Sequence, residues 1–199
     1  MRTLFTVLIG IAFLSGCGGK TEPSCSPAKE IATSSVVRNG DTWNVAITSS
    51  NIDAPIDKVL EAANHPERGH ELVPESILKS DLVGENGNTK TMDIVARLDV
   101  LPPGFKVQNI KSEYTYYPEQ KRFTTKSIDF KLADINSDYR FEPTPDGKAT
   151  VVKFTQTSKD KAPMIVESLQ KGALCETFSI QVKVVRRALG LDKTEKPAG

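Results

Sequence analysis

Hydrophobic and polar residues alternate along several short segments between residues 42 and 157. In residues 42–48, for example, Trp43, Val45 and Ile47 fall on one face, which is typical of a half-buried strand. Short turns rich in Gly, Pro and Asn separate the later segments, and such turns join antiparallel neighbours. The pattern therefore predicts about seven strands, at residues 42–48, 78–83, 91–100, 106–117, 122–130, 133–142 and 149–157.

Helical spacing of apolar residues occurs in three further segments. It predicts short helices at residues 56–63 and 67–72, and a long helix from residue 162 to about residue 189 that ends at Gly190. The long helix carries two apolar stripes, so we expect it to be covered on two sides. Because a curved sheet cannot bury its concave face alone, we expect this helix to close the sheet and to leave a pocket between them.

The start of the first helix carries a short recognisable pattern. Ile52, Ala54, Pro55 and Val59 stand in the spacing I-x-A-P-x-x-x-V. This pattern and the order of elements over about residues 42–189 resemble the START-like superfamily, which includes Bet v 1-type proteins, polyketide cyclases and coenzyme Q-binding proteins. The family usually has an aromatic residue where this chain has Leu72.

The resemblance implies an α+β helix-grip fold. In that fold a curved antiparallel sheet of about seven strands wraps around a long C-terminal helix, in the order one strand, two helices, six strands and one helix. It also implies a cavity for hydrophobic ligands and few shared catalytic residues.

The first residues have the three parts of a secretory signal. Arg2 is positively charged, residues 4–14 are almost all apolar, and small residues precede Cys17. The apolar run is shorter than the roughly 20 residues that a membrane-spanning helix needs. The residues Leu14-Ser15-Gly16-Cys17 resemble the lipobox of bacterial lipoproteins. That resemblance implies cleavage before Cys17, a diacylglycerol on its thiol and an amide-linked chain such as palmitate; a plain signal peptide is the alternative.

The lipobox also predicts where the protein resides and how it is divided. We expect a lipid-anchored protein on the periplasmic side of the bacterial cell envelope. Gly18, rather than Asp, follows the cysteine, which favours the outer membrane over the inner one. The expected parts are a signal peptide at residues 1–16, a lipidated flexible tether at 17–40, a START-like domain at 41–190 and a polar tail at 191–199. A domain of about 150 residues is large enough for one hydrophobic core.

The charge pattern excludes one class of partner. The chain has 26 Lys and Arg residues and 25 Asp and Glu residues, for a net charge of +1, and the two signs are interspersed. A nucleic-acid-binding surface would require a basic stripe. We therefore expect no nucleic acid among the partners. The partners expected from the lipobox and the fold are a membrane, through lipidated Cys17, and a hydrophobic small molecule or lipid, and we expect the protein to be a monomer.

Two cysteines remain after Cys17 is assigned to the lipid. Cys25 lies in the expected tether and Cys175 in the long helix. In an oxidising compartment two such residues can form a disulfide. The alternative is two separate thiols, and the sequence leaves both possibilities open.

One polar cluster could be read as a metal site. His65, Glu67, His70 and Glu71 lie close together in the chain, but they lack a zinc-binding spacing such as H-E-x-x-H. We therefore predict a solvated surface here, with no metal and no cofactor. Nucleophile motifs such as G-x-S-x-G are also absent from the sequence, so we predict no catalytic residue.

The inward faces of the predicted elements supply the candidate ligand contacts. Each of these residues could equally belong to an ordinary core. The leading hypothesis is a membrane-tethered protein that binds or carries a hydrophobic, lipid-like ligand; the alternatives are a cyclase or hydrolase on the same fold and an envelope protein-interaction module. An enzyme would need converging groups with perturbed ionisation, in which this set is poor. The candidate contacts are Trp43, Met92, Ile94, Leu98, Tyr114, Tyr139, Phe141, Phe154 and Phe178.

Overall fold

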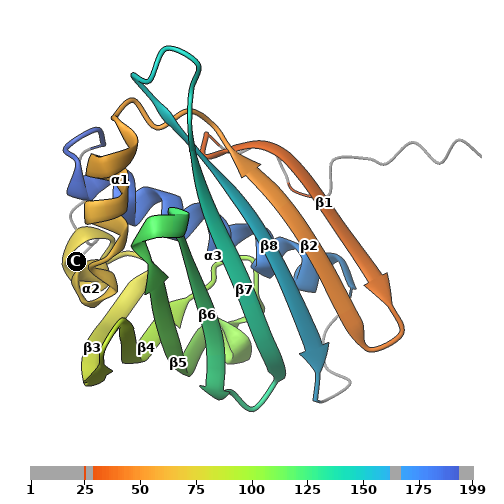
Figure 1. Cartoon of the computed structure of the whole chain (residues 1–199). Helices are drawn as coiled ribbons and strands as arrows, with labels where there is room; N and C mark the ends of the chain where they lie inside the picture. The colour runs from red at the N-terminus through yellow and green to blue at the C-terminus, as the bar shows by residue number, and fades with distance from the viewer. Residues whose placement is uncertain (1–24, 26–28, 162–166, 193–199) are drawn as a thin grey trace, which may run out of the picture.

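One curved antiparallel sheet with a long helix along its concave side makes up most of the structure (Figure 1). This computed structural model describes residue 25, residues 29–161 and residues 167–192. The strand order is β1-β2-β8-β7-β6-β5-β4-β3, which leaves β1 and β3 at the edges. The strands are β1 (Ile31–Asn39), β2 (Thr42–Ser49), β3 (Ile77–Asn86), β4 (Thr89–Arg97), β5 (Val107–Tyr117), β6 (Arg122–Asp129), β7 (Ala133–Pro143) and β8 (Thr150–Asp160).

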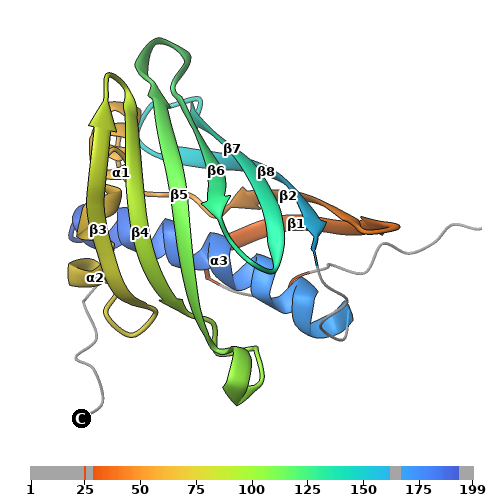
Figure 2. The same cartoon turned by 90° about the horizontal axis from the view of Figure 1, so that it is seen from below.

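The helices lie together on one side of this sheet. Helix α3 (Glu167–Ala188) runs along the trough that the sheet forms (Figure 2). The short helices α1 (Ile56–Ala63) and α2 (Gly69–Leu72), joined by the 3-10 turn η1 (Pro66–Arg68), contact α3 near its C-terminal end. Two more 3-10 turns, η2 (Pro103–Phe105) and η3 (Pro118–Gln120), precede β5 and β6.

Strand alternation in the sequence corresponds to burial in the structure. In β2, Trp43, Val45 and Ile47 are buried, whereas Asn44 and Ala46 between them are exposed. Successive side chains of a strand point to opposite faces, so one face of β2 meets the helix and the other meets solvent.

The first strand differs from the sequence prediction. Residues 31–39 were predicted as part of the tether that reaches residue 40, but they form β1 and pair antiparallel with β2, Val36 lying opposite Val45. Val36 is the only buried residue of the strand. Because the other positions are not buried, they need not be apolar, and β1 shows no alternation of apolar and polar residues in the sequence. Its backbone covers the open edge of β2, which would otherwise present unpaired N–H and C=O groups. The sheet consequently has eight strands.

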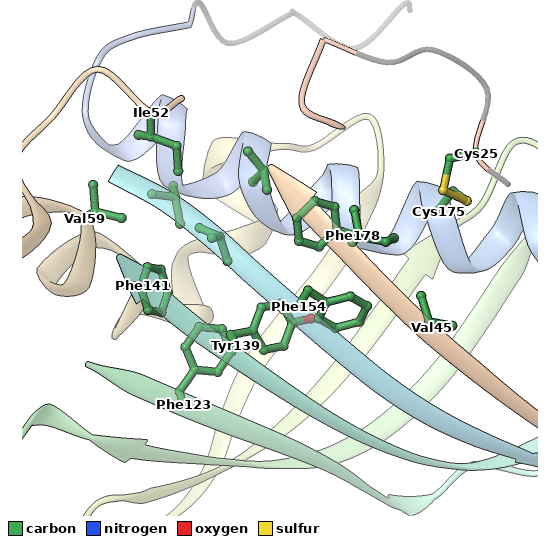
Figure 3. Close-up of a cluster of buried hydrophobic side chains, with 14 of the residues drawn as sticks. Cys25, Val45, Ile52, Val59, Phe123, Tyr139, Phe141, Phe154, Cys175 and Phe178 are labelled. Atoms are coloured by element: carbon green, nitrogen blue, oxygen red, sulfur yellow. A yellow bond between two sulfur atoms is a disulfide. The ribbon is translucent and has the colours of Figure 1, made fainter. Parts of the chain in front are cut away.

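Aromatic rings connect the sheet to α3 in the main hydrophobic core (Figure 3). The ring centroids are 4.2 Å apart for Phe123 and Tyr139, 4.7 Å for Tyr139 and Phe154, and 5.2 Å for Phe154 and Phe178. Aromatic pairs at such distances contribute beyond the area that they bury. This continuous stack fixes the distance of the helix from the central strands.

The second apolar stripe of α3 packs against a different part of the fold. Ile180 and Val184 join a smaller cluster with Val73, Ile77 and Leu98, from the segment after α2, from β3 and from the segment after β4. The long helix is therefore covered on two sides, as its two stripes predict.

Polar contacts hold the C-terminal end of α3. Arg187 donates to the carbonyl oxygen of Leu72 over 2.9 Å and forms an ion pair with Glu75 at 2.7 Å. Arg186 forms an ion pair with Asp192 at 2.6 Å. Gly190 has a φ of +70°, a conformation that glycine adopts readily and that commonly ends helices. The predicted start of this helix, from residue 162, lies outside the described residues.

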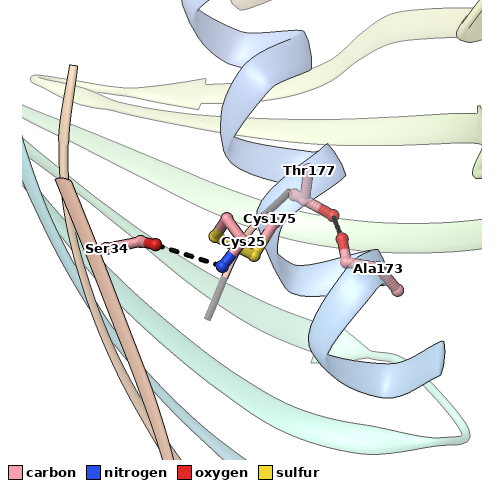
Figure 4. The surroundings of a disulfide bond; sticks show 5 residues. All are labelled: Cys25, Ser34, Ala173, Cys175 and Thr177. Atoms are coloured by element: carbon pink, nitrogen blue, oxygen red, sulfur yellow. Dashed lines mark hydrogen bonds between the residues drawn. A yellow bond between two sulfur atoms is a disulfide. The ribbon is translucent and has the colours of Figure 1, made fainter. Parts of the chain in front are cut away.

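A disulfide joins the N-terminal segment to α3 (Figure 4). Cys25 and Cys175 are bonded across a sequence separation of 150 residues. The backbone N–H of Cys25 also donates to the hydroxyl oxygen of Ser34 in β1 over 3.1 Å. Of the two possibilities that the sequence leaves open, the structure has the bonded pair.

Candidate ligand cavity

A cavity lies between α3 and the concave face of the sheet. The cavity has a volume of about 180 Å³. Its walls are formed by β3 to β8, by the loops between them and by α3. Small side chains on the helix, such as Ala173 and Thr177, leave this space open where larger ones would fill it. A concave, partly enclosed site of this kind is the usual setting for a small-molecule ligand.

Apolar side chains form much of the cavity lining, although α3 also contributes Gln170, Thr177 and Gln181. Ile77, Ile94 and Leu98 contribute from β3, β4 and the segment after β4, while Leu174 and Ile180 contribute from α3. These side chains favour a ligand with substantial apolar surface. Each Å² of apolar surface removed from water contributes about 25 cal/mol to the free energy of binding, before the entropic and desolvation costs of binding are subtracted.

On the sheet side of the cavity, a row of polar residues, the polar strip, crosses the middle of the sheet. Ser112 on β5 lies opposite Ser127 on β6, and Ser137 on β7 lies opposite Gln156 on β8. All four side chains line the cavity, together with Ser158 on β8. Two of them are joined to each other, because the Ser137 hydroxyl donates to the Gln156 carbonyl oxygen over 3.2 Å. The site therefore combines apolar walls with a strip of neutral hydrogen-bonding groups.

Two tyrosines close one end of the cavity. Tyr114 and Tyr139 both line it, and the Tyr114 hydroxyl hydrogen-bonds to Gln181 of α3. Burial raises the pKa of Tyr114 to about 12, although the Gln181 hydrogen bond opposes part of the shift. Burial also raises the pKa of Tyr139. Both phenols are consequently neutral at physiological pH.

Asp160 is the one carboxylate among the described lining residues. It accepts hydrogen bonds from Trp43 Nε1 at 3.2 Å and Gln170 Nε2 at 2.6 Å, and Arg38 lies 3.4 Å away. These contacts occupy the carboxylate and hold it at one end of the site. It is therefore a structural group that ties β8 to β2 and α3.

The sheet opens beside the cavity. Strand β6 pairs with β5 only from Lys111 onward, so the first residues of β5 have no partner on β6. Strand β6 pairs with β7 only between Asn136 and Arg140, so the last residues of β6 have no partner on β7. The first residues of β5 and the loop from β6 to β7 therefore separate. Four side chains border both the cavity and a groove on the outside of the sheet at this place: Gln108, Ile110, Phe130 and Leu132. This opening is the mouth of the cavity.

The predicted pocket residues fall into two groups. Ile94, Leu98, Tyr114 and Tyr139 line the cavity. The other predicted contacts are buried without lining it: Trp43, Met92, Phe141, Phe154 and Phe178.

This division has a physical reason. The rings of Phe123, Tyr139 and Phe154 fill the trough at one level of β6, β7 and β8, so the open space lies further along the same strands, where Thr125, Ser137 and Gln156 line the cavity. The polar strip was missed because the sequence interpretation favoured large inward residues. Its signal was nevertheless present, since Ser137 shares a strand face with Ile135 and Tyr139.

The histidine-containing segment forms local pairs. His65 Nδ1 lies 2.7 Å from Glu67, and Arg68 pairs with Glu71 at 3.3 Å. Within the described part of the chain, no group of three or more His, Cys, Asp and Glu side chains is arranged to hold a metal ion. Over the same residues, none of the helices is both long enough and apolar enough to cross a bilayer. The expected signal peptide and Cys17 lie outside the described residues.

Comparison with solved structures shows which proteins share this architecture. The protein TTHA0849 from Thermus thermophilus is 19% identical with a TM-score of 0.63, over 75% of this chain and 99% of that one. The Zhui aromatase/cyclase from Streptomyces sp. R1128 is 14% identical with a TM-score of 0.58, over 75% and 92%. A START superfamily protein from Mycobacterium smegmatis is 14% identical with a TM-score of 0.58, over 75% and 99%. The predicted helix-grip fold is confirmed.

Sequence comparisons give the family. Curated protein sequences include no significant match to this chain. A family model described as polyketide cyclase / dehydrase and lipid transport matches residues 44–178, which run from β2 into α3 and include most of the cavity lining. The chain therefore belongs to this family, within the START-like superfamily.

Proposed function

We propose that the protein binds or carries a hydrophobic ligand in the cavity between α3 and the sheet, without transforming it, while anchored to a membrane of the bacterial cell envelope. The cavity is the observation that carries the proposal. Its walls are largely apolar, it opens at a mouth beside β5, and it lies where the family model matches.

The composition of the cavity favours binding over catalysis. Among the described lining residues the ionisable groups are Asp160, Tyr114 and Tyr139. Asp160 is held by Trp43 and Gln170, and the raised pKa of each tyrosine keeps it protonated. General acid-base catalysis works best with a group whose pKa lies near the working pH. The alternative is a cyclase, the activity named for the Streptomyces neighbour.

The membrane anchor rests on the sequence. Leu14-Ser15-Gly16-Cys17 has the form of a lipobox, and an apolar run precedes it. One acyl chain binds a bilayer only marginally, whereas several chains hold a protein firmly. We place the mature protein on the periplasmic side, and Gly18 after the cysteine favours the outer membrane.

The ligand is tested by recovering it. The protein is purified from its native host, and the compounds extracted from it are identified by mass spectrometry. Ala96→Phe places a ring in the cavity wall, whereas Ala46→Phe places the same ring on the exposed face of β2. The proposal predicts that an apolar compound accompanies the wild type and Ala46→Phe but is depleted from Ala96→Phe. Equal recovery from both variants, or none from the wild type, would contradict it.

The anchor is tested separately. Mass spectrometry of the N-terminal peptide should show acyl chains on Cys17, and Cys17→Ser should move the protein from the membrane fraction to the soluble one. Membrane association that survives Cys17→Ser would refute the lipid anchor without bearing on the cavity.

A further inference from the structure

Two loops border the cavity mouth and expose apolar side chains there. Residues 98–106 join β4 to β5, and residues 130–132 join β6 to β7. Val100 in the first loop is 39% exposed, and Val107, which follows this loop at the start of β5, is 48% exposed. Phe105 is half-buried and lines the groove outside the mouth. These residues form the rim of the mouth, and exposed apolar residues gathered in one place mark a surface for a partner or a membrane.

Lysine side chains lie beside the apolar residues of the rim. Lys111 and Lys131 both line the groove at the mouth, and neither forms an ion pair with another residue that the structure describes. Two carboxylates line the same groove, of which Asp93 is paired with Lys79 at 2.7 Å and Asp129 is not paired within the described residues. Apolar side chains together with cationic groups are the combination that binds the surface of a bilayer containing anionic lipids.

The disulfide fixes the N-terminal segment to α3 beside this rim. Cys175 of α3 is bonded to Cys25. The next residue of the helix, Glu176, accepts hydrogen bonds from the backbone N–H groups of Asp99 over 2.9 Å and Val100 over 3.2 Å. The first loop of the rim and the disulfide are therefore held on the same turn of α3.

The next described contact of the N-terminal segment lies at the other end of α3. Lys29 forms an ion pair with Asp192, which follows the helix, at 2.7 Å. Thirteen residue steps separate Cys175 from Ala188 at the end of α3, which corresponds to about 20 Å of helix. A chain anchored at Cys17 would therefore enter the domain at the mouth end with the disulfide formed, and at the opposite end without it.

From these observations we propose that the rim of the cavity mouth rests on the bilayer that holds the lipid anchor, and that the disulfide between Cys25 and Cys175 sets this orientation. Seven residues separate Cys17 from Cys25, so the anchored chain keeps the mouth end of the domain close to the lipids. The apolar side chains of the rim enter the interface, and Lys111 and Lys131 contact lipid phosphates. This inference rests on the proposed lipid anchor.

Tryptophan scanning of the full-length, lipidated protein tests the contact. Val107→Trp and Gln120→Trp are each placed in vesicles of phosphatidylethanolamine and phosphatidylglycerol whose brominated chains quench any tryptophan that touches them. Gln120 is exposed and follows the other end of β5, and the ten residue steps of that strand cover roughly 33 Å. The wild type gives the baseline, because its only tryptophan, Trp43, is buried. Emission from Val107→Trp should be quenched, and emission from Gln120→Trp should stay at the baseline.

Two further changes test the orientation and the lysines. Cys25→Ala with Cys175→Ala, added to Val107→Trp, should reduce the quenching, with circular dichroism confirming that the variant is folded. Lys131→Glu, added to Val107→Trp, should also reduce it and leaves the core intact. Lys148→Glu is the matched control, because Lys148 is equally exposed and lies in the turn between β7 and β8, at the end of β7 opposite the mouth; it should not alter the quenching.

The outcomes separate this inference from the proposed function. Quenching of both tryptophan variants, or of neither, in protein that floats with the vesicles overturns the inference and leaves the lipid anchor in place. Quenching of Val107→Trp that persists in full without the disulfide, or that Lys131→Glu and Lys148→Glu change equally, also overturns it. Protein that does not float with the vesicles refutes the anchor and this inference together, and leaves ligand binding in the cavity unaffected.

Discussion

Removal of the disulfide between Cys25 and Cys175 should destabilise the domain substantially. The bond closes a loop with a sequence separation of 150 residues. Loop-closure entropy for this length corresponds to about 5 kcal/mol at room temperature, and measured disulfides typically contribute about 2–4 kcal/mol. We therefore expect Cys25→Ala with Cys175→Ala to lower the free energy of unfolding by about 2–4 kcal/mol.

Urea denaturation followed by tryptophan fluorescence measures this loss directly. Trp43 is the only tryptophan of the chain and is 0% exposed, so its emission reports the opening of the core. With a slope of about 2 kcal/mol per M, the midpoint should fall by roughly 1–2 M. Reduction of the wild type with dithiothreitol should reproduce the shift while retaining both sulfur atoms.

The double variant is also the control, because dithiothreitol should leave its midpoint unchanged. A midpoint that is the same in the oxidised wild type, the reduced wild type and the variant would refute the argument. It would mean that the cross-link constrains the unfolded chain far less than its loop length implies.

Three further predictions concern packing and pH. Gly69→Ala should cost no more than about 1 kcal/mol, because its Cβ would lie 2.8 Å from Cδ1 of Ile77 and that atom, at the end of a flexible side chain beside the cavity, can move aside; adding Ile77→Val, which removes the atom, should recover the loss in urea denaturation. Phe154→Ala should cost about 3–5 kcal/mol by the same assay, and a loss below about 1 kcal/mol would contradict its place in the aromatic stack. The hydrogen bond from Arg186 lowers the pKa of Asp192 from 3.8 to about 2, so this carboxylate stabilises the fold above about pH 4 and loses the effect as the pH falls toward 2. Asp192→Asn should therefore be less stable than the wild type at neutral pH but equal to it below pH 2, and a gap that persists in acid would argue against the ion pair.

The sequence predicts most of the secondary structure because burial and alternation coincide. Trp43, Val45 and Ile47 mark β2 since one face of that strand is buried and the other is not. In β1 this signal is missing because Val36 alone is buried, and the strand depends on backbone pairing with β2. A strand held mainly by its backbone leaves little trace in a hydrophobicity pattern.

The cavity could be predicted less well than the sheet. Which face of a strand points inward follows from its alternation, but whether the space inside is filled depends on how the rings of Phe123, Tyr139, Phe154 and Phe178 meet. That arrangement is a property of the packed core and is set by side chains distant in the sequence. Large aromatic residues were predicted to contact a ligand, and most of them occupy the trough themselves.

The link between Cys25 and α3 has a mechanical consequence for the proposed lipid-anchored protein. Eight residue steps separate Cys17 from Cys25, so a fully extended chain would hold Cys25 within about 28 Å of a lipid-bearing Cys17, and Cys175 of α3 lies 5.6 Å from Cys25 between Cα atoms. With the disulfide broken, the first described residue beyond the gap is Lys29, twelve steps from Cys17, and the extended chain would limit only the distance from Cys17 to Lys29, to about 42 Å. The same disulfide ends in the helix that forms one wall of the cavity. In a lipid-anchored protein the disulfide would therefore attach the lipid to the domain through α3, and would keep this wall of the cavity within about one bilayer thickness of the membrane surface.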